Sequence, residues 1–266
     1  MKKYLYTIII SITFLSCEDV IDVELDTAPP RLVVEASINW FKGTVGDTQA
    51  ITLTTTTSFY NEDVPPASGA TVTIIDEMGN TFNFTENGAT GIYENNAFLP
   101  VIDREYTLTI IYQGETYTAT ETLKSVTTLE SVEQNDAGGF TGESTEIKIY
   151  YTDPASEKNY YFFKFESPYS NDLDVYDDKF FNGNQIFALF FEEDFVPGDE
   201  VTIQSFGISQ SYYNYMFTLL SNLGEGGFES QPATVKGNIV NQTNPDNFAF
   251  GYFRLSEADE FTYVIE

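Results

Sequence analysis

The chain has 266 residues, of which 12 are basic and 41 acidic, so its formal net charge is −29. A chain this acidic repels phosphate backbones and anionic lipid headgroups, which argues against nucleic-acid binding and against a basic peripheral membrane protein. The absence of histidine, together with a single cysteine, excludes Ser-His-Asp and Cys-His catalysis, an internal disulfide and a zinc site built from several His and Cys ligands.

The first 17 residues have the form of an export signal. Two lysines precede an apolar run over residues 4–15, which is shorter than the roughly 20 residues that cross a bilayer. The run ends in Phe-Leu-Ser-Cys and resembles a bacterial lipobox, with Phe14 where the usual pattern has an aliphatic residue. The resemblance implies a signal peptide over residues 1–16, cleavage between Ser16 and Cys17, and lipid on the Cys17 sulfur. A secretory signal with an incidental cysteine is the alternative.

Residues 17–30 are predicted to form a lipidated acidic tether. Five acidic residues follow the cysteine closely and resemble the surface-export signal of Bacteroidota lipoproteins, although a solvated linker would have the same composition. Acyl chains contribute about 0.8 kcal/mol of membrane-binding free energy per buried CH₂, so two or three chains anchor a protein stably in the membrane. Thr27, in Asp-Thr-Ala, lies in a segment that resembles a Bacteroidota O-glycosylation motif, which implies a candidate glycosylation site there. We expect an outer-membrane location facing the cell surface, with the periplasmic face as the alternative.

Residues 31–124 are predicted to form a β-sandwich. Tyr106, Leu108, Ile110 and Tyr112 alternate with threonines and other residues on the opposite face, as in a half-buried strand. Gly- and Asn-containing turns separate short strands without helical spacing, which favours a sandwich. The strands are expected at residues 31–41, 49–57, 70–76, 81–85, 105–112 and 115–123.

Part of this segment resembles transthyretin-like and carboxypeptidase-regulatory domains. The resemblance covers residues 70–117 and lies in an alternating strand, an Asp-x-x-Gly turn, a Gly-x-Tyr step at Gly91 and Tyr93, and a closing Tyr-x-Leu-x-Ile strand. It implies an immunoglobulin-like or transthyretin-like sandwich for residues 31–124.

Residues 125–266 are predicted to form a second β domain that carries one amphipathic helix. The helix is expected over residues 209–222, because apolar side chains recur there at helical spacing between Ser209 as a cap and Gly224 as a stop. The chain is therefore expected to be mainly all-β, with two sandwich-like domains in tandem. The strands are expected at residues 128–135, 145–152, 159–166, 185–192, 200–206, 234–239, 248–255 and 261–265.

An acidic stretch in the second domain is a weak calcium candidate. Calcium takes six to eight oxygen ligands, and Asp172, Asp174, Asp177 and Asp178 could supply several of them. The spacing, glycine and terminal glutamate of an EF-hand are absent, so a solvated acidic loop is the preferred interpretation. No cofactor is expected.

Two further patterns in this domain could carry function. Glu192, Glu193 and Asp194 could join the aspartates as paired carboxylates for glycoside hydrolysis, but chance pairs are frequent in so acidic a chain. Aromatic residues in alternating strands are more often core. The exceptions, placed by the pattern in a polar loop, are candidate partner contacts: Tyr176, Phe180 and Phe181.

The mature chain as a whole resembles a Bacteroidota lipoprotein family catalogued as a domain of unknown function. The resemblance lies in Cys-Glu-Asp-Val-Ile-Asp at 17–22, in residues 30–36, in Gly-Asn-Ile at 237–239, in Asn-Pro at 244–245 and in Gly-Tyr-Phe at 251–253. Members are often encoded beside TonB-dependent outer-membrane transporters, which implies a non-enzymatic accessory or ligand-binding subunit of an uptake complex. A structural or adhesive surface module is the alternative, and a carboxylate-based hydrolase is a more remote one. The pattern identifies neither ligand nor partner.

Overall fold

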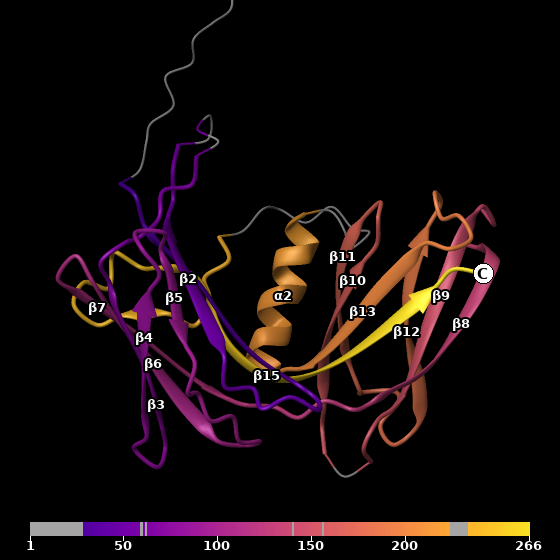
Figure 1. The fold of residues 1–266 in the computed structure, drawn as a ribbon, viewed down its shortest axis with the longest axis horizontal. Coiled ribbons are helices and arrows are strands. Elements are labelled where there is room, and N and C mark those ends of the chain that lie inside the picture. The colour runs from indigo at the N-terminus through magenta and orange to yellow at the C-terminus, as the bar shows by residue number, and fades with distance from the viewer. Residues whose placement is uncertain (1–28, 59–60, 62, 140, 156, 224–233) are drawn as a thin grey trace, which may run out of the picture.

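The structure is a computed structural model that describes residues 29–58, 61, 63–139, 141–155, 157–223 and 234–266. The predicted signal peptide, the lipidation site at Ser16 and Cys17, Thr27 and the expected helix stop at Gly224 lie outside these residues. Among these described residues the elements are strands and the helix α2, Gln210–Asn222 (Figure 1), which confirms the prediction of a mainly β fold that carries a helix. No helix in the described ranges is both long and apolar enough to cross a membrane.

In the described ranges, the helix α2 interrupts a series of strands. The elements in chain order are β1 (Leu32–Phe41), β2 (Gln49–Thr55), β3 (Thr71–Asp76), β4 (Thr81–Glu86), β5 (Ile92–Asn95), β6 (Glu105–Tyr112), β7 (Glu115–Thr122), β8 (Leu129–Gly138), β9 (Ser144–Thr152), β10 (Tyr160–Glu166), β11 (Asn171–Asp177), β12 (Gln185–Glu192), β13 (Glu200–Gly207), α2 (Gln210–Asn222), β14 (Val240–Asn241) and β15 (Phe250–Val264).

The strands form where one face can be buried. In β6, Tyr106, Leu108 and Ile110 are fully buried, while the residues between them are partly exposed, as their alternation predicted. The helix begins where the sequence indicated, because the Ser209 side chain accepts the Tyr212 N–H at 3.2 Å. Local patterns therefore determine most of the individual elements.

The strands assemble into two lobes, seen at the left and right of Figure 1. A twelve-stranded sheet runs in the order β11-β10-β13-β15-β1-β2-β5-β4-β3-β6-β7-β14. The part of this sheet from β1 to β14 curls around one hydrophobic cluster, the first core, and forms the first lobe. In the second lobe, β11, β10, β13 and the end of β15 pack around the second core against a three-stranded sheet, β12-β9-β8. Helix α2 covers the outer face of β10 and β13 through a third cluster.

The last strand joins both lobes. β15 pairs in parallel with β1 from Val33↔Phe250 to Phe41↔Ala258, and antiparallel with β13 from Ala258 to Val264. Phe253 lies in the first core, whereas the far end of the strand packs on the second core. β14 also returns to the first lobe by pairing with β7. Residues 234–266 therefore contribute to both lobes and not to the second alone.

Some strand predictions were wrong. The two strands expected at 248–255 and 261–265 are one strand, β15, because Ser256 and Ala258 are small enough to be fully buried as the strand passes between the cores. The strand expected at 234–239 does not form. There the Asn238 side chain bonds the N–H and C=O of Phe253 at 2.9 Å each, and β14 begins only at Val240.

The glycines near the C-terminal end of the chain allow close backbone contact. A Cβ on Gly237 would lie 1.5 Å from the Gly251 carbonyl oxygen, and a Cβ on Gly251 would lie 2.0 Å from the Val34 oxygen. Gly251 also has a φ of +92°, which L side chains rarely adopt. The motifs at 237–239 and 251–253 therefore serve the packing of β15 on its neighbours.

Candidate functional site

A groove of about 560 Å³ runs along the free edge of β11 in the second lobe. In the part of the chain that the structure describes, β11 is the last strand of the large sheet and pairs with β10 alone. Five consecutive residues, Asp172 to Tyr176, line the groove. The Val175 N–H donates to Asp174 Oδ1 at 2.8 Å. The groove therefore exposes a strand edge whose polar groups can accept a partner.

The walls of the groove are mostly apolar and come mainly from α2 and β12, with Phe165 from β10. Helix α2, which Figure 1 shows beside β10 and β11, contributes Phe217 and Leu220. Strand β12 of the opposing sheet contributes Leu189 and Phe191. Phe217 is 57% exposed and Phe191 is 41% exposed, so two aromatic rings are presented to solvent beside the strand edge. Apolar walls with few polar groups are typical of ligand sites.

Two carboxylates face this apolar surface. Burial, followed by the charges of Glu192 and Asp174, raises the pKa of Asp172, which lies at the exposed rim. Burial also raises the pKa of Asp174, although hydrogen bonds from the Tyr176 hydroxyl and the Val175 N–H oppose this shift. No lysine or arginine is among the described residues that line the groove. The groove therefore offers uncompensated negative charge.

Tyr176 does not lie in a polar loop, so that part of the prediction is wrong, whereas its contact with a partner stays a prediction. It belongs to β11, packs against the second core, and meets the Phe163 ring edge-on at a centroid distance of 5.6 Å. Its hydroxyl accepts the Leu189 N–H at 3.4 Å, which connects β11 to β12. Tyr176 thus forms part of the groove as a partly buried wall.

Phe180 and Phe181 are exposed, as expected for candidate partner contacts. Phe180 is 77% exposed and Phe181 is 45% exposed, and their rings lie 6.5 Å apart in a turn after β11. The Lys179 ammonium lies 5.3 Å from the Phe180 ring centroid. Neither phenylalanine lines the groove. They form a separate surface feature, and contact with a partner there stays a prediction.

The acidic stretch is not a calcium loop. Asp172, Asp174 and Asp177 belong to β11, where extended backbone directs alternate side chains to opposite faces. Asp178 is buried, and its Oδ2 accepts the Asn159 N–H at 2.7 Å. Among the residues the structure describes, no cluster of three or more acidic, histidine or cysteine side chains could hold a metal ion.

The second group of carboxylates stabilises a turn. Glu192 accepts the Ser170 hydroxyl at 2.6 Å and the N–H groups of Glu193 and Asp194 at 3.0 and 3.3 Å. Glu193 and Asp194 are exposed beyond the end of β12. Glu192 alone comes near the groove, through its effect on the Asp172 carboxyl.

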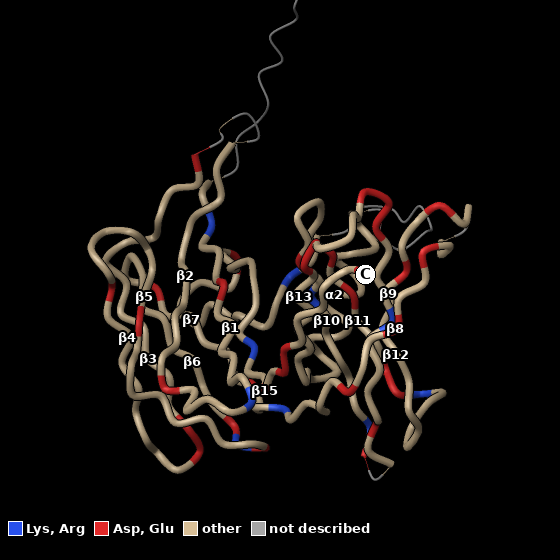
Figure 2. The backbone as a smooth tube through the Cα atoms, turned by 45° about the vertical axis from the view of Figure 1, so that its right-hand side comes forward, with Lys and Arg blue, Asp and Glu red and all other residues tan. Residues whose placement is uncertain are grey.

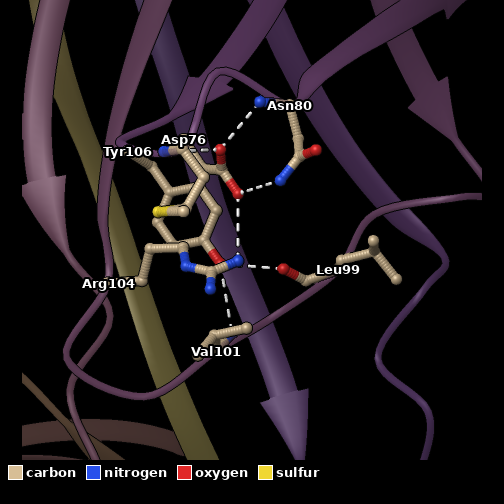
Figure 3. Close-up of polar contacts among 7 residues, drawn as sticks. Asp76, Asn80, Leu99, Val101, Arg104 and Tyr106 are labelled. Atoms are coloured by element: carbon tan, nitrogen blue, oxygen red, sulfur yellow. Dashed lines mark hydrogen bonds and ion pairs between the residues drawn. The ribbon is translucent and has the colours of Figure 1, made fainter.

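The first lobe holds a polar cluster whose bonds are all structural (Figure 3). The buried Asp76 carboxylate accepts the backbone N–H groups of Met78 and Asn80, the Asn80 amide at 2.8 Å and Arg104 Nη1 at 3.0 Å. Burial acts to raise the pKa of Asp76, but these bonds and the Arg104 charge outweigh it, so the pKa is lowered. The Tyr106 hydroxyl donates to the Leu99 carbonyl oxygen at 2.8 Å and accepts the Val101 N–H at 3.0 Å. Asp76 is the first residue of the Asp-x-x-Gly turn noted in the sequence.

A buried arginine occupies the junction between the lobes. Arg254 is 4% exposed, and its guanidinium donates to Ser256 Oγ at 2.7 Å and Asn39 Oδ1 at 2.8 Å. Its carbon Cζ lies 4.7 Å from the Phe206 ring centroid and 5.2 Å from that of Tyr212. Burial lowers the pKa of Arg254. The contacts that stabilise the guanidinium are therefore neutral oxygens and aromatic faces, and not a carboxylate.

Sequence reasoning missed β11 as a strand and with it most of the groove. Asp-Leu-Asp-Val-Tyr at 172–176 does alternate with period two, but its acidic residues made the segment resemble a solvated loop. The walls could not be inferred, since Leu189 and Phe217 approach β11 only through tertiary packing. Figure 2 shows acidic positions spread over both lobes, so charge alone did not distinguish this stretch.

Comparison with known proteins gave one family and several solved structures. A family model described as a domain of unknown function, DUF4249, matches residues 18–262. No curated protein matches the chain. A two-domain fibronectin type-III segment from chicken tenascin is 14% identical, with a TM-score of 0.23, and the match covers 67% of this chain and 90% of that one.

Two other solved structures are similarly remote. A chain of a cytokine receptor complex is 8% identical, with a TM-score of 0.25 over 68% of this chain and 85% of that one. A DUF4785 family protein from Legionella pneumophila is 10% identical, with a TM-score of 0.24 over 65% of this chain and 52% of that one. These TM-scores are too low to support an argument from likeness.

Proposed function

Because the chain belongs to the DUF4249 family of domains of unknown function, we propose that it is a non-enzymatic surface lipoprotein that binds a partner through the β11 groove. In this proposal Cys17 carries the lipid anchor in the outer membrane, and the body faces the cell surface. The partner is a TonB-dependent outer-membrane transporter or the ligand delivered to it. The observation that carries the proposal is a strand edge that, among the described residues, is open between apolar walls.

The groove favours binding over catalysis. Acid–base hydrolysis by two carboxylates needs environments that move their pKa values apart, so that one donates a proton while the other is ionised. Here the pKa values of Asp172 and Asp174 are both raised, chiefly by burial. The other polar side chains lining the groove are those of Tyr176 and Ser221. Two carboxylates whose pKa values are both raised, and which lie beside apolar walls, suit the recognition of a cation.

Affinity purification from intact outer membranes tests the proposal. Tagged protein with its anchor is recovered from detergent-solubilised outer membrane, and the co-purified proteins are identified by mass spectrometry. We expect a transporter to accompany the wild-type chain and to be lost with Phe217→Ser, which removes an exposed ring from the groove wall. Val45→Ser, which alters a 72% exposed residue of the first lobe, serves as the matched control and is expected to retain the partner.

Two outcomes would contradict the proposal. Recovery of the wild-type lipoprotein alone would favour the structural or adhesive module. Retention of the partner by Phe217→Ser would place the contact elsewhere, and a double replacement of Phe180 and Phe181 by serine then tests the loop that the sequence indicated. The anchor is tested separately, because Cys17→Ala should abolish incorporation of labelled palmitate and release the protein from the membrane.

A further inference from the structure

We propose that the β11 groove binds an extended peptide segment in which basic and apolar side chains alternate, and that this segment pairs with β11 as an added strand. The inference rests on the proposed binding function and specifies the chemistry of the partner. It combines three features of the groove: an open strand edge, uncompensated carboxylates and an apolar wall.

The first feature is the open edge of β11. Strand addition needs a row of backbone groups accessible from one side, and five consecutive residues of β11 line the groove, an edge about 16 Å long. The Val175 N–H is bonded to the Asp174 side chain. An incoming carbonyl can replace that carboxylate as acceptor, which frees Asp174 to pair with a charge on the incoming strand.

The second feature is the pattern of charge along the edge. Asp172 and Asp174 are two residues apart, so both point to the same side of the strand at a spacing of about 6.6 Å. Basic side chains two apart on an added strand have the same spacing. A negative surface that lacks its own cation gains most from such a ligand, because burial of the carboxylates has already removed part of their hydration.

The third feature is the apolar face on the other side of β11. Leu173 and Val175 alternate with the aspartates and pack in the third cluster together with Leu220 of α2. Phe217 stands beside them at the mouth of the groove. Apolar side chains that alternate with the basic ones would pack against this wall. The alternation of basic and apolar side chains in the ligand therefore mirrors the alternation of acidic and apolar side chains in β11.

A second copy of this chain is a poor occupant of the groove. Edge-to-edge pairing of β11 with itself would bring the acidic stretches of two chains together, each with a net charge of −29. Like charges placed opposite one another in a sheet are destabilising. The charge of the groove favours a basic partner segment.

Peptide binding to the full-chain protein in detergent tests the inference. The probe is a fluorescein-labelled, end-capped decapeptide of alternating lysine and valine, followed by fluorescence anisotropy. We expect it to bind with an affinity that falls as salt rises. The glutamate–valine counterpart and a version N-methylated along one edge should each bind at least tenfold more weakly. Equal binding of the lysine and glutamate peptides would refute the charge argument, and equal binding of the N-methylated peptide would refute strand addition.

Single charge removals locate the contact. Asp174→Asn should weaken binding of the lysine–valine peptide at least tenfold, and Asp172→Asn at the rim about threefold. Glu94→Gln removes the same charge from an exposed position in the first lobe and should change affinity less than twofold. Peptide binding should also slow amide hydrogen exchange in β11. Equal losses in all three variants would show a non-specific effect of net charge and overturn the proposal.

The outcomes separate this inference from the proposed function. If the peptide does not bind but Phe217→Ser still abolishes recovery of the membrane partner, the partner occupies the groove with another chemistry and only the inference fails. If Phe217→Ser retains the partner, the groove is not the contact and the proposed function fails with it.

Discussion

Replacing Asp76 by asparagine should destabilise the first lobe far more than the same change at an exposed carboxylate. The asparagine amide would direct N–H groups at Arg104 Nη1 and at the Asn80 side chain, both of which now donate to the carboxylate. Removing one member of a buried ion pair costs about 3 kcal/mol or more. Asp103→Asn is the matched control, since the Asp103 side chain is 74% exposed and lies 3.7 Å from Lys124, so the loss should stay below about 1 kcal/mol.

Urea unfolding at pH 7 measures this difference. The fluorescence of Trp40, the one tryptophan, reports on the first core, against which it packs. With an m-value of about 3 kcal/mol/M, the unfolding midpoint of Asp76→Asn should fall by about 1 M. Midpoints for Asp76→Asn and Asp103→Asn that differ by less than their experimental error would refute the reasoning.

The pH dependence of the same pair supplies a second check. The pKa of Asp76 is lowered from its usual 3.8, so the folded state binds a proton less readily than the unfolded chain. The stabilisation by Asp76 is therefore fully present above about pH 4 and is lost as the pH falls through the folded-state pKa. The difference in unfolding free energy between the wild type and Asp76→Asn should shrink correspondingly in acid.

Four further substitutions, one of them a control, test other parts of the fold. Gly237→Ala should lower the free energy of unfolding in urea by about 3 kcal/mol, because its Cβ would lie 1.5 Å from a backbone oxygen. Gly114 has open space around it but a φ of +81°, so Gly114→Ala should lower the free energy by about 1 kcal/mol. Ser209→Ala should cost about 1 kcal/mol through loss of the α2 cap, measured by thermal unfolding, with no loss contradicting the capping role. Phe253→Ala should lower the free energy of unfolding by about 3–5 kcal/mol. Because β15 couples the lobes, unfolding followed by tryptophan fluorescence and by circular dichroism should still give coincident transitions. Separate transitions would show that β15 does not couple them.

Local sequence patterns were sufficient for elements whose periodicity is undisturbed. The alternation in β6 and the helical spacing after Ser209 each predicted an element that the structure contains. β5 was missed because four residues after Gly91 are too few to establish alternation. β15 was divided because Ser256 and its polar neighbours resemble a turn, although Ser256 is fully buried within the strand.

The candidate site depends on information that local patterns do not contain. Whether β11 is an edge strand follows from the order of the whole sheet, and its walls come from α2 and β12, which are distant in the sequence. The prediction assigned Asp172 and Asp174 to a loop, whereas both belong to β11. Phe217 was predicted to lie on the helix, yet only the packing of α2 beside β11 gives its exposed ring a role.

The path of β15 constrains the order in which the molecule can form. β1, at the start of the described chain, has a long parallel contact with β15 at its very end, and Phe253 completes the first core. A chain that is synthesised N-terminus first therefore cannot complete its first lobe until β15 has emerged from the ribosome. Contacts so far apart in sequence make folding slow. The closing strand thus makes the N-terminal strand β1 depend for its parallel neighbour on a segment more than 200 residues later in the chain.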